Sequence, residues 1–566
     1  MIILGISCFY HDSAVAIIKD GQVIAAAQEE RFTRIKHDNN FPYKSIEYCL
    51  NSLRIAINEV DYISFYEKPI IKFDRILTQH VQYFPKSIKI FFKTIPSWIN
   101  EKLQIQKILK DKCHYHGKIV FIPHHLSHAA ASYLSSPFSE AAILTLDGVG
   151  EWATTTYGFA KGINLKLEKQ INFPHSLGLF YSDLTAYLGF SVNNDEYKVM
   201  GLSGYGNPKK YYSKIKQLIK INHDGSFQLD TQYFSFEYQE KMFNQKLCLL
   251  LGGPARQSDS EMSSRYQDIA AATQLVFEET LFSLLNHLYK KHPTPNLILS
   301  GGSALNSLAN GKILKHTLFK NLFITPDPGD GGASLGAALY TYHCLLKNDK
   351  NTSPHSVYLG PEFDSFQIKK TIDEFKLKSV LINDQKKLLD KVSDLLIKQK
   401  VIGWFQGRME WGPRALGNRS ILASATQKEM MDIINAKVKH REMFRPFAPV
   451  ILREKTKDYF ITDKNIPVST DYMLLVYPFK SKVKSKVPAV VHIDGTGRLQ
   501  TVDEKSNSKY YRLIKAYYQK TGIPLIINTS FNIRGEPIVC TPADAVKCFL
   551  STEIDYLVIG NYLIKK

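Results

Sequence analysis

The chain opens with IILGISCFYHDSAVAIIKDGQVIAAA at residues 2–27, a stretch in which short apolar runs alternate with turns. The runs IILGIS and AVAII have the length of strands, and Asp20-Gly21 is a hairpin signal before a third run, QVIAAA. The stretch therefore predicts a meander of three neighbouring strands at the start of the chain.

A similar arrangement returns at residues 141–159, where AAILTLD is followed by GVG, a threonine-rich run and the turn Lys161-Gly162. Two such meanders predict a duplicated unit in which each sheet is followed by helices, as in phosphate-binding folds of the actin, Hsp70 and sugar-kinase type. The helical periodicity of residues 264–290 and the strand-like run NLILS at 296–300 fit this α/β pattern.

The length of 566 residues predicts at least two domains. Residues 345–360 are polar and contain a Ser-Pro step, so we place the boundary there, with a first domain at 1–350 and a second at 351–566. The second domain is also expected to be α/β, with helices at 366–400, strands at 401–405, 446–452, 524–528 and 555–560, and a helix that starts at Thr541.

The composition is that of an ordinary globular protein, with 44% hydrophobic and 22% charged residues. No run approaches the roughly 18 consecutive apolar residues of a membrane span, and neither a basic segment nor a cleavage site marks the first run as a signal peptide. The seven cysteines are scattered without CxxC spacing, which favours a reducing compartment over a disulfide framework. We therefore expect a cytoplasmic protein without stable membrane insertion.

The formal net charge of +19 first suggests nucleic acid as a partner. The sequence contains no nucleic-acid-binding signature, however, and its lysines are spread widely, so no nucleic acid partner is expected. The charge indicates either a lysine-rich surface or attraction of anionic substrates such as nucleotides and phosphates. Residues 84–103 mix lysine with large apolar residues, but Pro96 interrupts the pattern, which favours a packing segment over a membrane-surface helix.

The segment PHHLSHA at residues 123–129 follows a strand-like run and opens an alanine-rich helix. On a helix, His124 and His128 lie one turn apart on the same face, where two imidazoles can bind one metal ion, whereas His125 points elsewhere. Histidines on such a helix can equally be packed or exposed, so this spacing alone leaves the question open.

Two aspartates in glycine-flanked turns strengthen the metal interpretation. Asp147 ends an apolar strand before a glycine, and Asp330 lies in PDPGDGG before an expected helix. A neighbouring glycine lets a carboxylate approach a ligand without steric hindrance. With His124 and His128, the two aspartates would form a site of two nitrogen and two oxygen ligands, which suits iron(II), zinc or manganese and leaves positions open for substrate.

Glycine-rich turns also suggest a nucleotide site in the first domain. Gly301 and Gly302 follow the strand at 296–300 and, with Asn306, open a helix, so that backbone N–H groups can face phosphate or ribose. His11 lies in the first turn of the opening meander, where related folds hold phosphate. Each of these signals alone is equally typical of an ordinary turn.

Basic and amide side chains gather in the second domain. The loop GRMEWGPRALGNRS at 407–420 carries three arginines, and further cations follow in KHREMFRPFAP. Arginine binds phosphate through two parallel hydrogen bonds, so converging cations suit ATP together with an acyl phosphate better than a solvated basic face. The candidate residues of this site are the loop arginines Arg408, Arg414 and Arg419, the later cations Lys439, Arg441, Arg445 and Arg498, and the polar run 528–532 with Arg534 after it.

Phrases along nearly the whole chain, in order, include HDSAVAIIKDG, QEERFTRIKHD, HHLSHAAASY, LDGVGEWATT, GGSALN, GDGGASLGAAL, GRMEWGPRALGNRSIL and NTSFNIRGEPIV. They resemble the NodU/CmcH/TobZ-type O-carbamoyltransferase family. The resemblance implies a Kae1-like first domain of the duplicated actin/Hsp70 type and a YrdC-like α/β second domain.

The resemblance also implies a two-step reaction. The second domain would combine carbamoyl phosphate and ATP into carbamoyl adenylate, and the first would transfer the carbamoyl group to an acceptor hydroxyl. It implies a divalent metal, iron(II) above all, on His124, His128, Asp147 and Asp330. Arg414, Lys439, Arg445 and Arg498 would hold phosphates, helped by Asn528 and Ser530, while Gly301, Gly302 and Asn306 would contact the nucleotide and His11 would act as a base beside the acceptor.

The identity of the acceptor stays open at this stage, because a sugar, an antibiotic or a glycan precursor with a hydroxyl group would fit. The oligomeric state also stays open, and a homodimer is one option. Family members often read LAPYG where this chain has LSGYG at 202–206, a loop that can affect acceptor choice. Two other functions fit parts of the sequence: a tRNA threonylcarbamoyl-type transferase, which has the same two domain types, and a non-catalytic nucleotide-binding module.

Overall fold

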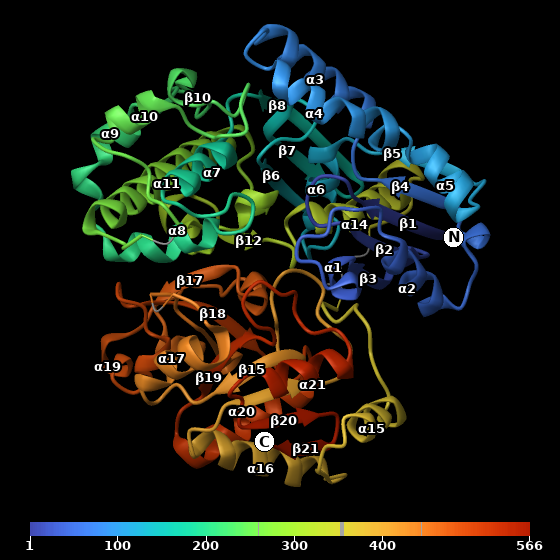
Figure 1. The fold of residues 1–566 in the computed structure, drawn as a ribbon, viewed down its shortest axis with the longest axis vertical. Coiled ribbons are helices and arrows are strands. Elements are labelled where there is room, and N and C mark those ends of the chain that lie inside the picture. The colour runs from blue at the N-terminus through green and yellow to red at the C-terminus, as the bar shows by residue number, and fades with distance from the viewer. Residues whose placement is uncertain (259, 351–355, 443) are drawn as a thin grey trace. The chain divides into compact units, whose positions relative to one another are not determined.

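The computed structural model describes residues 1–258, 260–350, 356–442 and 444–566. The chain divides into two compact units, each described by itself below (Figure 1). Unit 1 comprises Met1–Ile24 and Asn39–His355, and unit 2 comprises Ala25–Asp38 and Ser356–Lys566.

Unit 1 contains two five-stranded sheets of the same topology, ordered β3-β2-β1-β4-β5 and β8-β7-β6-β11-β12. In each, the first strand pairs antiparallel with the second and parallel with the fourth. The duplication predicted from the two similar stretches is therefore confirmed. The strands are β1 (Ile2–Ser7), β2 (Ala14–Lys19), β3 (Gln22–Gln28), β4 (Tyr62–Phe65), β5 (Lys118–Phe121), β6 (Glu140–Leu146), β7 (Ala153–Lys161), β8 (Asn164–Asn172), β11 (Asn296–Ser300) and β12 (Asn321–Phe323).

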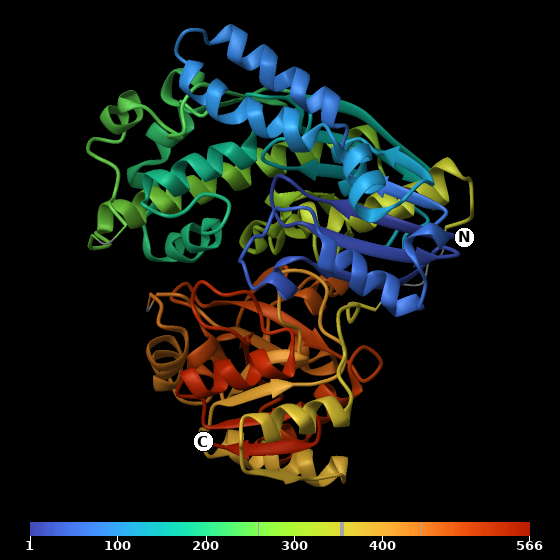
Figure 2. The same ribbon diagram turned by 45° about the vertical axis from the view of Figure 1, so that its right-hand side comes forward.

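Two equivalent helices lie between these sheets. Helix α6 (His124–Tyr133) follows the last strand of the first sheet, and α14 (Asp330–Tyr340) follows the last strand of the second. Each packs on the sheet of the other repeat, since α14 contacts β1, β2 and β4 while α6 contacts β6, β7 and β11. The two helices also pack against each other, which gives four layers in the order sheet, α14, α6, sheet (Figures 1 and 2).

The α6–α14 pair is packed unusually closely. A methyl group on Gly336 would overlap the carbonyl oxygen of Ser127 and lie 2.7 Å from the backbone nitrogen of Ala131. Small side chains permit this approach because a larger Cβ substituent would push the backbones apart. The alanine-rich composition of both helices thus has a packing reason, with buried residues that include Ala129, Ala130, Ala131, Ala337 and Ala338.

The remaining helices of unit 1 lie outside this four-layer centre. Helix α11, predicted at 264–290, spans Ser264–Lys291 and contacts α7, α8 and α9. Among the described residues, none of the helices combines the length and apolarity that crossing a membrane requires. The other elements are α2 (Tyr43–Leu53), α3 (Pro69–Gln82), α4 (Ile88–Ser97), η2 (Trp98–Lys102), α5 (Ile105–Cys113), α7 (Leu177–Tyr187), α8 (Glu196–Leu202), α9 (Tyr212–Lys216), β9 (Ile219–Ile221), β10 (Phe227–Leu229), α10 (Gln245–Leu250), α12 (Ser307–Asn310) and α13 (Ile313–His316).

Two local expectations differ from the structure. Pro96 was expected to interrupt the segment at 84–103, but it lies inside α4, near the end of that helix. The helix expected to open at Gly301 is instead a short 3-10 turn, η6 (Gly302–Leu305), followed by the one-turn helix α12. Gly301 adopts a φ of +91°, which turns the chain sharply after β11 and leaves no room for a continuous helix.

Unit 2 is built on one mixed sheet of nine strands, ordered β13-β21-β20-β14-β15-β19-β16-β18-β17. Helices α16 (Gln385–Ile397) and α20 (Ser508–Thr521) share a buried core with Trp404 and Ile526 on this sheet. The α/β class is confirmed, as are the four predicted strands, although a further strand, β21, follows the last of them. The strands are β13 (Ser379–Leu381), β14 (Ile402–Phe405), β15 (Arg419–Ala423), β16 (Ala448–Leu452), β17 (Leu475–Pro478), β18 (Thr496–Val502), β19 (Leu525–Ser530), β20 (Tyr556–Ile559) and β21 (Tyr562–Lys565).

The helix predicted to start at Thr541 is α21 (Pro542–Ser551), and it has the expected capping box between Thr541 and Asp544. Unit 2 contains further helices besides α16, α20 and α21. They are α1 (Glu30–Thr33), α15 (Ser365–Glu374), α17 (Glu429–Ile433), η8 (Ile434–Lys439), α18 (Thr456–Tyr459) and α19 (Ser481–Lys484).

The division of the chain differs from the predicted domains in one segment. The predicted boundary between 350 and 351 adjoins residues 351–355, which lie outside the described residues. Residues Ala25–Asp38 were assigned to the first domain but belong to unit 2, where Arg31 donates to the carbonyl of Gly412 at 3.0 Å and Arg34 to that of Ile538 at 2.6 Å. Hydrogen bonds between segments so distant in sequence leave no mark on local periodicity.

We predict that Gly336→Ala destabilises unit 1 by about 1–3 kcal/mol, because the added methyl group overpacks the α6–α14 crossing. Urea denaturation followed by circular dichroism measures this change. Gly329→Ala is the matched control, since a methyl group there meets Asp327 only at an ordinary 3.6 Å. Equal midpoints for the two variants would show that the crossing tolerates a larger separation.

Candidate functional site

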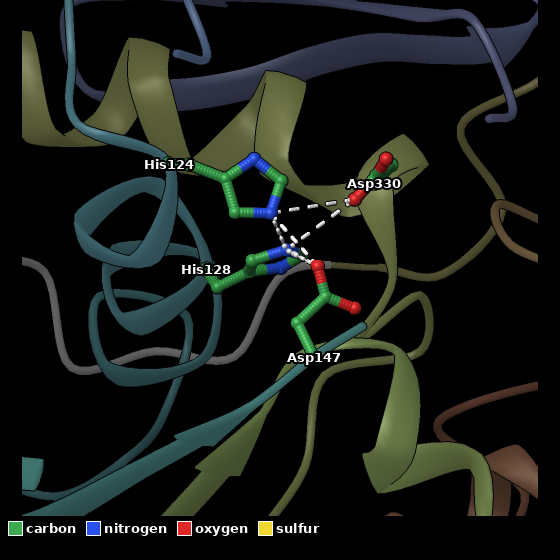
Figure 3. Close-up of side chains that lie close together, drawn as sticks. All are labelled: His124, His128, Asp147 and Asp330. Atoms are coloured by element: carbon green, nitrogen blue, oxygen red, sulfur yellow. Dashed lines mark hydrogen bonds and ion pairs between the residues drawn. The ribbon is translucent and has the colours of Figure 1, made fainter. Parts of the chain in front are cut away.

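Four buried side chains meet at one end of the α6–α14 pair (Figure 3). His124 is the first residue of α6 and His128 lies one turn later, while Asp330 is the first residue of α14. Asp147 directly follows β6, in the hairpin before β7. The repeat symmetry brings the two helix starts together, so residues far apart in sequence form one cluster.

The distances within this cluster suit a shared ligand. His124 Nε2 lies 2.8 Å from Asp147 Oδ2 and 3.1 Å from His128 Nε2. Asp330 Oδ1 lies 3.4 Å from His128 Nε2 and 3.7 Å from His124 Nε2. One ligand atom from each of the four residues lies within 4.8 Å of all the others, so the group could hold a metal ion.

The chemistry of the donor atoms also fits a cation. Both Nε2 atoms face the same point, and Asp330 Oδ2 is buried without a hydrogen-bond partner among the described residues. Burial lowers the pKa of His128, but hydrogen bonds to Asp147 and Asp330 outweigh this effect and raise the pKa to about 10. Burial raises the pKa of Asp147, yet its histidine neighbours hold that pKa well below the usual range. The cluster therefore favours positive charge at its centre.

Neighbouring residues hold the four ligands in place. Both oxygens of Glu151 accept the backbone N–H of His124, at 2.9 and 3.2 Å, and so cap the start of α6. Glu67 Oε2 lies 3.8 Å from His124 Nδ1. Asp147 Oδ1 accepts the backbone N–H of Gly302 at 3.1 Å, and a methyl group on Gly302 would lie only 2.8 Å from that oxygen. The glycine is thus needed for this contact.

The third histidine of the motif has a structural role. His125 Nδ1 lies 2.6 Å from Thr145 Oγ1, and His125 Nε2 lies 2.9 Å from the carbonyl oxygen of Ala153. Burial and the charge of His124 lower the pKa of His125 to about 3, so its ring is neutral. The expectation that His125 points away from the metal pair is confirmed.

His11 lies in the hairpin between β1 and β2, which is the counterpart of the hairpin that carries Asp147. Its Nδ1 lies 2.8 Å from Asp12 Oδ2 and its Nε2 lies 2.7 Å from the carbonyl oxygen of Asn193. Burial lowers the pKa of His11, but Asp12 and then Asp330 outweigh this and raise it to about 10. The ring is protonated at neutral pH, so the predicted role as a base would require prior loss of that proton.

The residues predicted to contact the nucleotide lie beside Asp147, but their groups already have partners. The N–H of Gly301 donates to the carbonyl of Pro328 at 2.9 Å, and that of Gly302 donates to Asp147. Asn306 caps α12 and exchanges hydrogen bonds with Gln274 at 3.1 Å. Nucleotide contact by these residues stays a prediction.

In unit 2, Lys439 is the centre of the predicted basic site. Its side chain is only 3% exposed, and its ammonium contacts the backbone and hydroxyl oxygens of Ser530 and both oxygens of Asn532. Burial and the charges of Arg441 and Arg445 hold the pKa of Lys439 well below its usual range. A buried lysine with neutral oxygens and other cations around it creates a positive potential that favours binding of an anion.

A second group extends this site along the same face of the sheet. Asn528 lies two residues before Ser530 on β19 and donates to Gln500 at 2.7 Å and to the carbonyl of Ala415 at 3.1 Å. Gln500 lies two residues after Arg498 on β18, and its amide donates to the carbonyl of Leu416 at 3.0 Å. The structure therefore connects Asn528 and the strand of Arg498 with the loop that carries Arg414.

The three arginines of that loop have different roles. Arg419 is fully buried, donates to the carbonyls of Gln406 and Pro361 among others, and lies 3.7 Å from the ring centre of Phe405. Arg408 donates to the carbonyls of Leu359 and Gly360. Both of these arginines donate to backbone carbonyls. Arg408 and Arg414 are partly exposed, whereas Arg419 is buried.

Sequence reasoning missed the residues that support the metal cluster. Glu67, Glu151, Tyr10 and Lys72 were not among the candidates, although Glu67 lies two residues after the end of β4, much as Asp147 lies directly after β6. The signal that identified Asp147, a carboxylate at the end of a buried parallel strand, could therefore have identified Glu67 as well. Glu151 and Lys72 lie in a loop and a helix without such a signal.

Comparison with known proteins agrees with this architecture. The family model described as carbamoyltransferase N-terminus matches residues 2–339, and the one described as carbamoyltransferase C-terminus matches residues 393–566. The chain belongs to the carbamoyltransferase family and is an enzyme that transfers a carbamoyl group. The resemblance found in the sequence motifs is confirmed.

Relatives align over most or all of the chain. Uncharacterized protein sll1178 of Synechocystis is 42% identical over 100% of this chain and 96% of its own length. Nodulation protein NolNO of Sinorhizobium fredii is 35% identical over 99% of this chain and 79% of its own length. Among solved structures, full-length HypF in a phosphate- and nucleotide-bound form covers 61% of this chain and 56% of its own, with 14% identity and a TM-score of 0.32, which is too low to assign a function.

We predict that His128→Ala lowers the affinity for a divalent metal at least about 100-fold, because it removes one of four ligands. Titration of metal-free protein with Zn²⁺, Mn²⁺ and, without oxygen, Fe²⁺ measures this change calorimetrically. His116→Ala on the surface is the control and should bind like the wild type. Unchanged binding by His128→Ala would place the metal elsewhere.

The same titration should depend on pH. A bound metal must displace the proton that His128 holds with a pKa of about 10, so affinity rises with pH and falls about tenfold for each unit below that value. The measurement is the apparent dissociation constant between pH 6 and 8. A flat profile would contradict ligation by this imidazole.

We predict that Arg419→Met destabilises unit 2 by about 2 kcal/mol or more, because several buried carbonyls lose their donor at once. Arg512→Met is the control, since Arg512 is half exposed and pairs with a half-exposed Glu504. Thermal unfolding compares the two variants. A small effect at Arg419 would mean that the loop carbonyls find other donors.

Proposed function

We propose that the chain is an ATP-dependent O-carbamoyltransferase in which unit 2 forms carbamoyl adenylate and unit 1 transfers its carbamoyl group to an acceptor hydroxyl. Carbamoyl transfer follows from family membership, whereas the adenylate and the kind of acceptor are the proposal. We further propose a small acceptor, such as a sugar, an antibiotic or a glycan precursor. The observation that carries the proposal is the buried Lys439, whose hydrogen-bond partners among the described residues are neutral oxygens.

The first step needs a site for several phosphates. Carbamoyl phosphate loses its phosphate to water, the resulting carbamate oxygen attacks the α-phosphorus of ATP, and the bond to pyrophosphate breaks. Negative charge builds on the phosphoryl oxygens during this exchange, and fixed cations stabilise it. Lys439, Arg445, Arg414 and Arg498 would supply these charges, with Asn528 and Ser530 as neutral donors.

The second step needs an activated carbonyl beside a hydroxyl group. The acceptor oxygen attacks the carbamoyl carbon, a carbon–oxygen bond forms, the bond to the AMP phosphate breaks, and the hydroxyl proton leaves. A divalent metal on His124, His128, Asp147 and Asp330 would supply Lewis-acid polarisation or orientation, and the donor set suits iron(II), zinc or manganese. His11 could take the proton only after losing its own.

We predict that Lys439→Met lowers carbamoyl-AMP formation about 100-fold, because the phosphoryl charge loses a buried cation. The assay supplies ATP, Mg²⁺ and carbamoyl phosphate, and detects carbamoyl-AMP by mass spectrometry and pyrophosphate by a coupled reaction. Lys437→Met is the matched control in the same helical turn, since Lys437 is exposed and pairs with Glu553.

The same assay assigns the step to one unit. His128→Ala should form carbamoyl-AMP within about twofold of the wild type, because its cluster belongs to unit 1. Wild-type protein that releases no pyrophosphate in response to carbamoyl phosphate would end the proposal. If Lys439→Met releases pyrophosphate like the wild type, the adenylating site does not include this lysine.

A further inference from the structure

Arg75 on α3 is a buried cation that lacks an ion-pair partner among the described residues. Its side chain is 6% exposed, its Nε is buried without a hydrogen bond, and its guanidinium forms no hydrogen bond or ion pair with any described residue. The guanidinium carbon lies 5.0 Å from the ring centre of Phe173. Burial without pairing is costly for a charged group, so such an arginine is expected where an anionic ligand completes its surroundings.

Two lysines add positive charge around the same carboxylate. Lys72 forms a buried ion pair with Glu67 at 2.6 Å. Lys102, half-buried at the end of η2, has no hydrogen bond or ion pair with the described residues and lies 5.2 Å from the ring centre of Trp98. Burial and the charge of Lys72 lower the pKa of Lys102. The negative charge of Glu67 favours the charged forms of both Arg75 and Lys102.

The carboxylates of this neighbourhood are directed at groups other than Arg75. Glu67 pairs with Lys72, and Glu101 acts on Lys102. Glu151 directs its oxygens at the backbone N–H groups of His124 and Lys68 rather than at a cation. Arg75 thus has no ion pair with the described residues, and a guanidinium presents paired N–H donors that match a carboxylate or a phosphate.

Tyr10 places this cationic group beside the metal cluster. Lys72 Nζ lies 4.4 Å above the Tyr10 ring, and a methyl group on Gly148 would lie 3.9 Å from the Tyr10 hydroxyl oxygen. Gly148 follows Asp147 directly. Burial and the charges of Asp147 and Asp330 raise the pKa of Tyr10, while the charge of Arg75 lowers it. The electrostatics of Tyr10 therefore depend on both the metal cluster and Arg75.

The cationic group adjoins a different part of the cluster from the proposed nucleotide contacts. Glu67 and Glu151 approach His124, whereas Gly302 approaches Asp147 Oδ1. An anion at Arg75 would thus lie on the His124 side, away from the glycines assigned to the nucleotide. The acceptor is the other molecule that the proposed reaction brings to this cluster.

We propose that Arg75, supported by Lys102, binds a carboxylate or phosphate group of the acceptor, so that the substrate class is an anionic hydroxyl compound such as a uronic acid or a sugar phosphate. This inference rests on the proposed function, since it assigns the second substrate of that reaction. Arg75 acts as a specificity-determining residue that holds the acceptor while a hydroxyl group of the same molecule faces the cluster.

The test compares charged and neutral sugars on the full-length protein. Binding of D-glucuronate, D-glucose 6-phosphate and D-glucose is measured by saturation-transfer NMR for the wild type, Arg75→Met and Arg75→Lys. We expect at least one charged sugar to bind about tenfold more tightly than glucose to the wild type, because one charge-assisted hydrogen-bonded pair is added. Arg75→Met should lose this preference and Arg75→Lys should keep part of it.

Lys93→Met is the matched control, because Lys93 lies on α4, the helix that follows α3, is exposed, and pairs with the exposed Glu240. It should bind all three sugars like the wild type. If Arg75→Met does not fold, Arg75→Lys still tests the proposal, since loss of the two-donor geometry should weaken binding of the charged sugar severalfold.

Three results would overturn the inference: equal binding of charged and neutral sugars, a preference that persists in both Arg75 variants, or displacement of the charged sugar by AMP. The last would assign Arg75 to the nucleotide instead of the acceptor. Carbamoyl-AMP formation is measured on the same samples. Its presence with any of these results means that only the acceptor assignment has failed, whereas its absence in the wild type means that the proposed function has failed.

Discussion

The close crossing of α6 and α14 is the constraint on which the candidate site of unit 1 depends. Each helix comes from one repeat and packs on the sheet of the other, so their starts meet only if the backbones approach closely. Gly336 and the surrounding alanines permit that approach. A wider crossing would separate His124 and His128 on α6 from Asp330 on α14, and the cluster would lose its geometry before any ligand was altered.

Helix starts are an unfavourable place for a cation, because their free N–H groups carry partial positive charge. The structure offsets this in two ways. Glu151 accepts the first N–H of α6, and Asp330 puts a carboxylate in the first turn of α14. Asp147 adds a second carboxylate from a strand end. These acidic groups oppose the helix fields, so the cluster could hold a divalent ion despite lying at two helix starts.

The sequence predicts those parts of the site that local patterns encode. Spacing on a helix identified His124 and His128, and glycine-flanked strand ends identified Asp147 and Asp330, because each signal spans only a few residues. Arg408, Arg414 and Arg419 look alike in the sequence, yet two of them organise backbone carbonyls. The assignment of Ala25–Asp38 to unit 2 was equally invisible, since its hydrogen bonds join residues several hundred positions apart.

Each unit buries one cationic side chain that forms no ion pair with the described residues, and this shared feature links fold to the proposed function. Lys439 lies among neutral oxygens beside two arginines, and the guanidinium of Arg75 lies over the ring of Phe173. Either arrangement lowers the stability of the free protein, because a desolvated cation is paired with nothing of opposite sign. Such sites persist in folded proteins when a bound anion restores the balance. A protein that handles phosphates in one unit and an anionic acceptor in the other would have both, and its excess of basic residues would draw these substrates from solution.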